Sequence, residues 1–168
     1  MKYRLTDETK EWCGRTLHRI EALKSFGNIS AGEKGGWIEK EENLSQEGSC
    51  WVYDNAQVCG DAWVYGNARV CGDARVCGDA WVSGYAQVYG NAQVKSVEDI
   101  FCIAGLGSRY GTTTIYRNDG GITVVCGCFL GTLEEFEAKV KETHGGNLYG
   151  REYLKLIELA KLHFEVEG

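Results

Sequence analysis

Eight valines recur at six-residue intervals between Val52 and Val94. The residues around them follow the hexad V-x-G-[D/N]-A-x. Alanine stands four residues after each of the first seven valines, and glycine stands two residues after six of those seven. A short fixed period of this kind is typical of a solenoid, in which each repeat stacks on the one before. We therefore predict a β-solenoid here, and we expect function to reside where the chain departs from the repeat.

Each position of the hexad suits one place in a triangular coil. Valine is stiff at χ1 and packs on a buried pleated surface, while alanine is small enough to point inward near a corner. Glycine followed by Asp or Asn tolerates the positive φ of a tight turn. Three hexads then form one coil, stacked on the next at a strand spacing of about 4.8 Å. Ile38 and Leu44 extend the valine position backward, with an expected bulge within residues 46–50.

The outward-pointing side chains of the repeat can be assigned to columns, because hexads three apart stack on the same face. The predicted columns are Trp63 with Trp81, Cys59 with Cys77 and then Lys95, and Tyr53 with Cys71 and Tyr89. Apolar side chains gathered on an outer surface usually mark an interface. The alternative is a simple stacking ladder between repeats. The candidate interface residues are Trp63, Trp81, Tyr53 and Tyr89.

The two ends of the chain break the period and are predicted to be separate units. Residues 1–36 form an N-terminal cap, because an open solenoid end exposes strand edges that must be covered. Residues 37–97 form the solenoid, and residues 98–168 form a small α+β module. Within the module we expect strands over 100–104, 112–117 and 122–129. Two helices follow, the first beginning at the capping box of Thr132 and Glu135 and ending at Gly145.

Cysteines are numerous in this chain, eight in all, but none forms a CxxC pair. Without a secretion signal, reduced thiols are favoured over a disulfide framework, and no metal site or cofactor is predicted. Cys126 and Cys128 would share one face of the third strand of the module. They are interpreted as two small buried apolar residues, with a redox or metal pair as the alternative.

Charge and hydropathy argue against two classes of partner. A net charge of −6 argues against a general nucleic-acid-binding protein, which would carry a basic stripe. Residues 96–168 hold 7 basic and 11 acidic side chains, so most of the acidic excess lies there. No apolar run approaches the roughly 20 residues of a membrane span. The polar N-terminus lacks the features of a signal or transit peptide, so we expect a cytoplasmic protein.

A glycine-rich segment from Gly105 to Thr114 connects two predicted strands and is the best candidate for a ligand site. Its backbone N–H groups can form an anion nest, and hydroxyl and guanidinium groups can add phosphate contacts. A tyrosine could stack on a base. The segment lacks the Gly-Lys-[Ser/Thr] of a P-loop, and a plain hairpin loop is the alternative. The candidate ligand contacts are Ser108, Arg109, Tyr110, Thr112, Thr113 and Arg117.

The repeat resembles the hexapeptide repeat of left-handed parallel β-helix proteins, and the left-handed turn is implied by that resemblance alone. The segments GRTLHRIEAL (14–23) and GGWIEKEENLSQEGSCWVYDNA (35–56) also resemble hexapeptide-repeat proteins of bacteria and their prophages. The segment GSRYGTTTIYR…CGCFLGTLEEFEAKV is similar to a C-terminal module of phage and gut-bacterial proteins. The implied fold is mainly β, a left-handed β-helix with a small C-terminal α+β module. The implied assembly is a homotrimer.

The best-known enzymes with this repeat are trimeric acyltransferases that use a histidine near a subunit junction. No histidine lies between residues 19 and 143 here, so a general base would have to be His144 or His163. We therefore predict no catalytic residues, and a non-enzymatic binding protein of phage or prophage origin. It would sequester a small phosphate-bearing ligand, such as a nucleotide immune signal, at a subunit interface. The alternative is a structural or protein-interaction scaffold that contacts a host or virion protein, and an acyltransferase is the third hypothesis.

Overall fold

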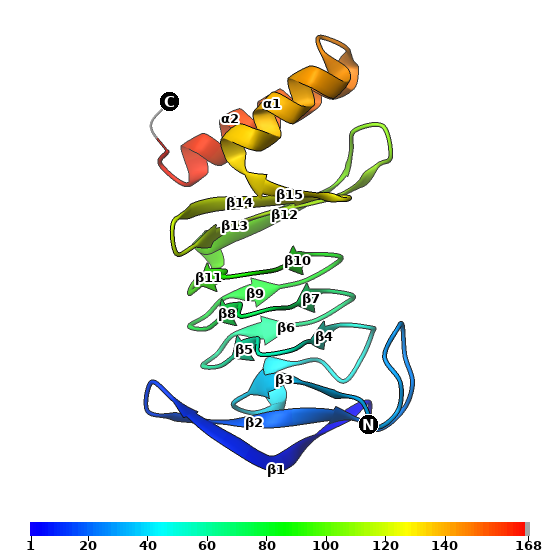
Figure 1. Ribbon diagram of the computed structural model, residues 1–168, viewed down its shortest axis with the longest axis vertical. Helices are drawn as coiled ribbons and strands as arrows, with labels where there is room; N and C mark the ends of the chain where they lie inside the picture. Colours follow the sequence, from blue (N-terminus) through cyan, green and yellow to red (C-terminus); the bar gives the residue numbers. More distant parts are fainter. Residues whose placement is uncertain (167–168) are drawn as a thin grey trace.

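The protein is mainly β and is built around a solenoid of about three turns, as predicted (Figure 1). The computed structural model describes residues 1–166. The solenoid strands have two residues each and recur at the predicted six-residue interval. They are β4 (Trp51–Val52), β5 (Gln57–Val58), β6 (Trp63–Val64), β7 (Arg69–Val70), β8 (Arg75–Val76), β9 (Trp81–Val82), β10 (Gln87–Val88) and β11 (Gln93–Val94).

Parallel pairing between successive coils produces the three faces of the solenoid. The faces are β4–β7–β10, β5–β8–β11 and β6–β9, so each residue pairs with the one three hexads later. All eight valines and the seven alanines that follow them are buried in the centre. Glycine is favoured at the corners, where Gly60 has a φ of +69° and a Cβ would lie 3.2 Å from the backbone of Gly78, although Asp54 adopts a φ of +51° at the first of them.

The first coil is irregular, as expected. It begins with β3 (Lys34–Ile38), continues through the short helix η1 (Glu41–Asn43), and includes Leu44, which bridges to Val64. The extra residues turn at Gly48, which has a φ of +67° and sits directly under the backbone of Gly66. The bulge therefore restores the stacking of the corners before the regular hexads begin.

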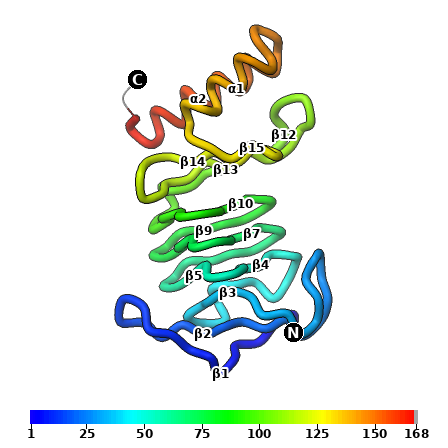
Figure 2. Tube along the Cα trace, in the orientation of Figure 1, coloured from blue at the N-terminus to red at the C-terminus, as the bar shows by residue number. Residues whose placement is uncertain are grey.

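The N-terminal end of the solenoid is covered by a hairpin of β1 (Tyr3–Trp12) and β2 (Arg15–Ala22). β2 pairs antiparallel with β3, so the hairpin extends the β5–β8–β11 face by backbone hydrogen bonds. The Tyr3 hydroxyl donates to the carbonyls of Glu41 at 2.9 Å and Leu44 at 2.7 Å. Figure 2 traces the chain from this hairpin at one end to the helices at the other.

The C-terminal module is an antiparallel sheet with two helices on its outer face (Figure 1). It follows the short helix η2 (Val97–Asp99). Its strands, in spatial and chain order, are β12 (Ile100–Leu106), β13 (Gly111–Asn118), β14 (Gly121–Cys126) and β15 (Phe129–Thr132), and its helices are α1 (Leu133–His144) and α2 (Leu148–His163).

The predicted third strand over 122–129 is wrong. The chain turns at Gly127, which has a φ of +59°, and continues as the separate strand β15. Cys126 and Cys128 therefore do not share one face of a strand. Cys126 is half-buried at the end of β14, whereas Cys128 is exposed in the turn.

Side chains of β13 join the module to the last coil of the solenoid. The backbone N–H of Gln87 donates to the Thr114 hydroxyl at 3.1 Å. The Tyr116 hydroxyl accepts the N–H of Tyr89 at 3.0 Å and donates to the Tyr89 carbonyl at 3.1 Å. Burial raises the pKa of Tyr116 to about 12, which keeps this phenol protonated as a donor. Hydroxyl groups thus satisfy backbone groups of Gln87 and Tyr89 at the end of the solenoid, and Ala92 forms a backbone bridge with Asn118.

No helix within residues 1–166 is both long and apolar enough to cross a membrane.

Candidate functional site

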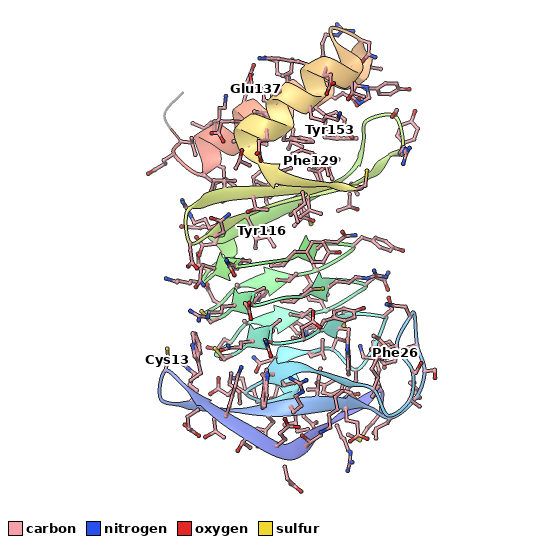
Figure 3. All side chains as sticks on the ribbon, viewed as in Figure 1. Cys13, Phe26, Tyr116, Phe129, Glu137 and Tyr153 are labelled. Atoms are coloured by element: carbon pink, nitrogen blue, oxygen red, sulfur yellow. The ribbon has the colours of Figure 1, made fainter. Side chains whose placement is uncertain are left out.

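A cavity of about 310 Å³ lies between the loop end of the four-stranded sheet and the two helices. Phe129 and Tyr153 project into this region from β15 and α2 (Figure 3). Four segments contribute: the β12–β13 loop, the β14–β15 turn, the second half of α1 and the start of α2. The lining residues are Ser108, Arg109, Gly111, Cys126, Gly127, Cys128, Phe129, Phe136, Lys139, Val140, Thr143, His144 and Tyr153.

The charge of this cavity differs from that of the whole chain. Arg109, Lys139 and His144 line it, and none of the described lining residues is acidic. The chain as a whole carries a net charge of −6. A cavity between the last coil and the sheet shows the opposite composition. It measures about 370 Å³, and its described lining includes Asp119 and Glu135 but no basic residue. The first cavity is therefore the place suited to an anion.

The floor of the cavity is a short chain of hydrogen bonds. The hydroxyl of Thr113, which is buried, donates to the Cys126 sulfur at 3.3 Å. The Cys126 thiol donates in turn to the Tyr153 hydroxyl at 3.6 Å. Burial, reinforced by the contact with Cys126, raises the pKa of Tyr153. Tyr153 therefore presents a neutral phenol to any bound molecule.

The β12–β13 loop is held against α2 by Gly107. Its φ is +73°, and the Tyr153 hydroxyl occupies the space where a Cβ would stand, so only glycine fits. The Gly107 N–H donates to the Glu152 carboxylate at 3.1 Å. This carboxylate thus occupies one backbone donor of the predicted anion nest. The remaining loop residues project past it, and Tyr110 at the tip is 70% exposed.

Of the six predicted ligand contacts, the structure brings Ser108 and Arg109 to the cavity. Tyr110 is next to them at the loop tip, and Thr113 lies one layer below, against Cys126. Thr112 alternates with Thr113 along β13 and so points to the opposite face of the sheet.

Arg117 lies at the other end of β13 and does not reach the cavity. Its guanidinium pairs with the Asp99 carboxylate at 3.0 Å and donates to the Phe164 carbonyl at 3.4 Å. It also lies 5.2 Å from the centre of the Phe164 ring. Arg117 therefore fastens the end of α2 to η2, a structural position that strand alternation alone did not reveal.

The two C-terminal histidines occupy different environments. His144, at the end of α1, lines the cavity, with its ring centre 5.8 Å from that of Tyr153. His163 bonds the Glu98 carbonyl at 2.8 Å and packs on Phe101 at 5.2 Å. Of the two histidines named as possible acyl-transfer bases, His144 therefore lines the cavity and His163 does not.

Lys139 and Tyr153 are cavity residues that sequence reasoning missed. Tyr153 lies in the second predicted helix, and neither it nor Lys139 belongs to a motif that marks a site. Lys139 and Thr143 are four residues apart on α1, which places both on the face that meets the loop. That face became recognisable only once the β12–β13 loop was seen to fold over it.

The predicted aromatic columns are present, but on different faces. Trp63 and Trp81 lie one above the other on the β6–β9 face in an edge-to-face arrangement, with 6.2 Å between ring centres, and they are 39% and 56% exposed. Tyr53 and Tyr89 lie on the β4–β7–β10 face, where both are half-buried against the core. Two of the four candidate interface residues are therefore widely accessible.

The cysteine column of the β5–β8–β11 face is also present. Cys59 is buried beneath the N-terminal hairpin with Cys77 packed against it, and the interaction with Cys59 lowers the pKa of Cys77. Within residues 1–166, no group of three His, Cys, Asp or Glu side chains is arranged to hold a metal ion.

Comparison with known proteins supports the hexapeptide-repeat assignment. Residues 56–72 and 68–84 match the YdcK β-solenoid repeat. Over 61 residues the chain is 39% identical to the "Uncharacterized acetyltransferase YdcK" of Escherichia coli (strain K12). That match covers 32% of this chain and 19% of the relative, so the chain spans about a fifth of the relative's length. The repeat similarity lies in the solenoid, and it leaves open whether this chain is an enzyme.

Proposed function

We propose that the protein binds a small phosphate-bearing ligand, of the nucleotide type, in the cavity between the β12–β13 loop and α1. The observation that carries this proposal is the charge of the cavity. Arg109, Lys139 and His144 converge on it without a lining carboxylate, in a chain with a net charge of −6.

The lining offers suitable contacts for both parts of such a ligand. A guanidinium such as that of Arg109 can hold a phosphate with two parallel hydrogen bonds, and Ser108 adds a hydroxyl beside it. Lys139 pairs with Glu142 at 2.9 Å, but their side chains are 58% and 71% exposed. Such an exposed pair is weak, so the ammonium can turn to a bound phosphate. Phe129 and Phe136 supply an apolar wall for a base.

Isothermal titration calorimetry tests this proposal. The probes are inorganic phosphate, AMP and ADP, with adenosine as the uncharged control. We expect AMP and ADP to bind with an affinity that falls as salt rises. Arg109→Ala should weaken binding at least tenfold, which corresponds to about 1.4 kcal/mol. Lys24→Ala is the matched control, because Lys24 is an exposed cation beside the N-terminal cap.

Two results would contradict the proposal. One is the absence of binding for every phosphate-bearing probe at millimolar concentration. The other is equal affinity in the wild type and in both Arg109→Ala and Lys139→Ala.

A second candidate function is acyl transfer, favoured by the position of His144 in the same cavity. The relative matched in the solenoid carries the name of an acetyltransferase, which supports testing this reaction. His144 would act as the general base toward an acceptor bound beside Ser108. The test is release of free coenzyme A from acetyl-CoA in the presence of amine and hydroxyl acceptors. A rate equal in the wild type and His144→Ala would exclude this role.

The proposed assembly remains a homotrimer with subunit contacts on the β6–β9 face. The exposure of Trp63 and Trp81 supports this location, because a solvated strand would carry polar groups there. The same two side chains would serve the alternative function, a scaffold that contacts another protein. Loss of a stoichiometric partner on Trp63→Ala, with the phosphate site intact, would favour the scaffold.

A further inference from the structure

Helix α2 carries an apolar stripe on its outer surface. Leu148 is 57% exposed and Leu159 is 52% exposed, although both lie on a helix whose opposite face is well buried. Between them on the same face stand Glu152 and Lys155. Together with Ile103 and Leu106 of β12, this stripe lines a groove of about 480 Å³.

The strand beside this groove has an uncovered edge. Among the described strands, β12 pairs with β13 on one side only, and Cys102, Ala104 and Gly105 are exposed. Its sequence, IFCIAGL, contains no charged residue and no proline. Edge strands that face solvent are normally protected by such residues, because an open edge invites pairing with another chain. The backbone edge of β12 borders the groove, into which Ile103 and Leu106 point, whereas Cys102 and Ala104 share the opposite sheet face with their partners Thr114 and Thr112.

The spacing of the stripe residues is the same in both directions along the helix. Positions 148, 152, 155 and 159 are separated by four, three and four residues. A second α2 lying antiparallel would place Leu148 opposite Leu159 of the second copy, and Leu159 opposite Leu148. The same arrangement places Glu152 opposite Lys155 of the second copy, and the reverse. The stripe is thus complementary to itself in residue type and in charge.

We propose that a second copy of this chain docks on the α2–β12 surface about a twofold axis. A twofold interface uses the same patch on both subunits, and the residue pattern here meets that requirement. Two leucine pairs would be buried, and two Glu152–Lys155 pairs would set the register. Among residues 1–166, Lys155 bonds the neighbouring Glu158 at 2.8 Å, with both side chains more than half exposed, so it is available to a partner. One oxygen of Glu152 holds the Gly107 N–H, and the other is the one that would meet Lys155 of the second copy.

Size-exclusion chromatography with light scattering tests this interface in the full chain. We expect Leu159→Asp to halve the mass of the wild-type particle. Lys155→Glu should weaken association at least tenfold, because it creates two carboxylate pairs. Glu152→Lys should act similarly, and the double variant Glu152→Lys with Lys155→Glu should restore the wild-type mass. Circular dichroism verifies that each variant is folded.

The controls separate this interface from other self-association. Leu23→Asp places the same charge on an exposed leucine beside the N-terminal cap, and it should leave the mass unchanged. The double variant Trp63→Ala with Trp81→Ala probes the proposed trimer contact on the β6–β9 face. Loss of that contact would not reduce the particle mass by half. The proposal is overturned if Leu159→Asp leaves the mass unchanged, or if the double charge reversal associates no better than the two single variants.

Discussion

The two ends of the solenoid are closed in different ways. At the N-terminal end, the β1–β2 hairpin continues a face of the solenoid by backbone pairing. Cations pack over aromatic rings between the hairpin and the coil, as Lys10 of β1 does over Trp37 of β3 at 4.6 Å and Arg75 of β8 over Trp12 of β1 at 5.6 Å. At the C-terminal end, the sheet is joined to the last coil by the side-chain hydroxyls of Thr114 and Tyr116 and by an isolated backbone bridge between Ala92 and Asn118.

This difference shows where function can be located. The hairpin extends an existing face and covers the first coil. The C-terminal sheet uses one face to close the solenoid and carries two helices on the other, which creates the basic cavity and the groove beside α2. Because the module contacts the last coil largely through side chains of one sheet face, its other face and its helices can form surfaces that the solenoid does not share. The N-terminal cap is therefore expected to determine stability, and the module to determine binding.

The largest expected effect concerns the N-terminal closure. Trp51 is fully buried between Tyr3 and Phe26, with ring centres 6.1 and 5.4 Å away. We expect Trp51→Ala to destabilise the protein by about 3–5 kcal/mol, because it leaves a large cavity under the cap. Thermal and urea unfolding measure the change. Tyr85→Ala, at a 65% exposed corner, should cost far less. Equal losses would show that the cap does not dominate stability.

An intermediate effect is expected at the C-terminal closure. Tyr116→Phe removes the hydroxyl that bonds both the N–H and the carbonyl of Tyr89. The buried backbone groups left behind should cost about 1–3 kcal/mol. Hydrogen exchange at the Tyr89 amide should accelerate while exchange in the N-terminal hairpin stays unchanged. Tyr85→Phe is the matched control, and uniform acceleration throughout the chain would contradict the independence of the two ends.

The smallest effect is the pH dependence of the contact between the two helices of the module. Glu137 of α1 bonds Lys141 at 2.7 Å and Lys161 of α2 at 2.8 Å, and these contacts lower its pKa to about 2. A carboxyl whose pKa is lowered in the folded state stabilises the fold at pH values above its ordinary pKa of 4.5. That contribution is lost as pH falls toward 2.

Glu137→Gln should therefore cost less than about 1 kcal/mol at pH 7, because the group is partly solvated. The difference in unfolding free energy between Glu137→Gln and the wild type should shrink when urea unfolding is repeated at lower pH. Glu158→Gln, which removes a more exposed pair on one helix, should show little change at any pH. If the difference in unfolding free energy grew as the pH was lowered, the assigned direction of the Glu137 pKa shift would be wrong.

Most of the solenoid was predictable because each hexad has only one way to satisfy its side chains. Valine and alanine must both be buried, and the corner must adopt positive φ, so the columns of Trp63 with Trp81 and of Tyr53 with Tyr89 followed directly. The third strand of the module was predicted wrongly, because Gly127 lies in a run of strand-forming residues. Nothing in the local pattern distinguished a turn there from a strand interior.

The candidate site was predictable only in part. Ser108 and Arg109 were recognised because a glycine-rich loop marks a hairpin end in the sequence itself. Arg117 was selected on residue type, but Asp99 and Phe164 occupy its guanidinium. Lys139 and His144 reach the cavity from a helix more than 20 residues later in the chain. Their approach depends on how that helix packs across the sheet, which has no local signature.

The sequence by itself determined the coil, its period and the order of its outer columns, because a six-residue period couples every residue to its neighbours three hexads away. It also marked both ends as departures from the repeat. Only the tertiary structure decided that a basic cavity forms beside the β12–β13 loop, and that the exposed face of α2 borders the open edge of β12. Those features depend on the packing of the helices over the sheet, and that packing is set by long-range contacts.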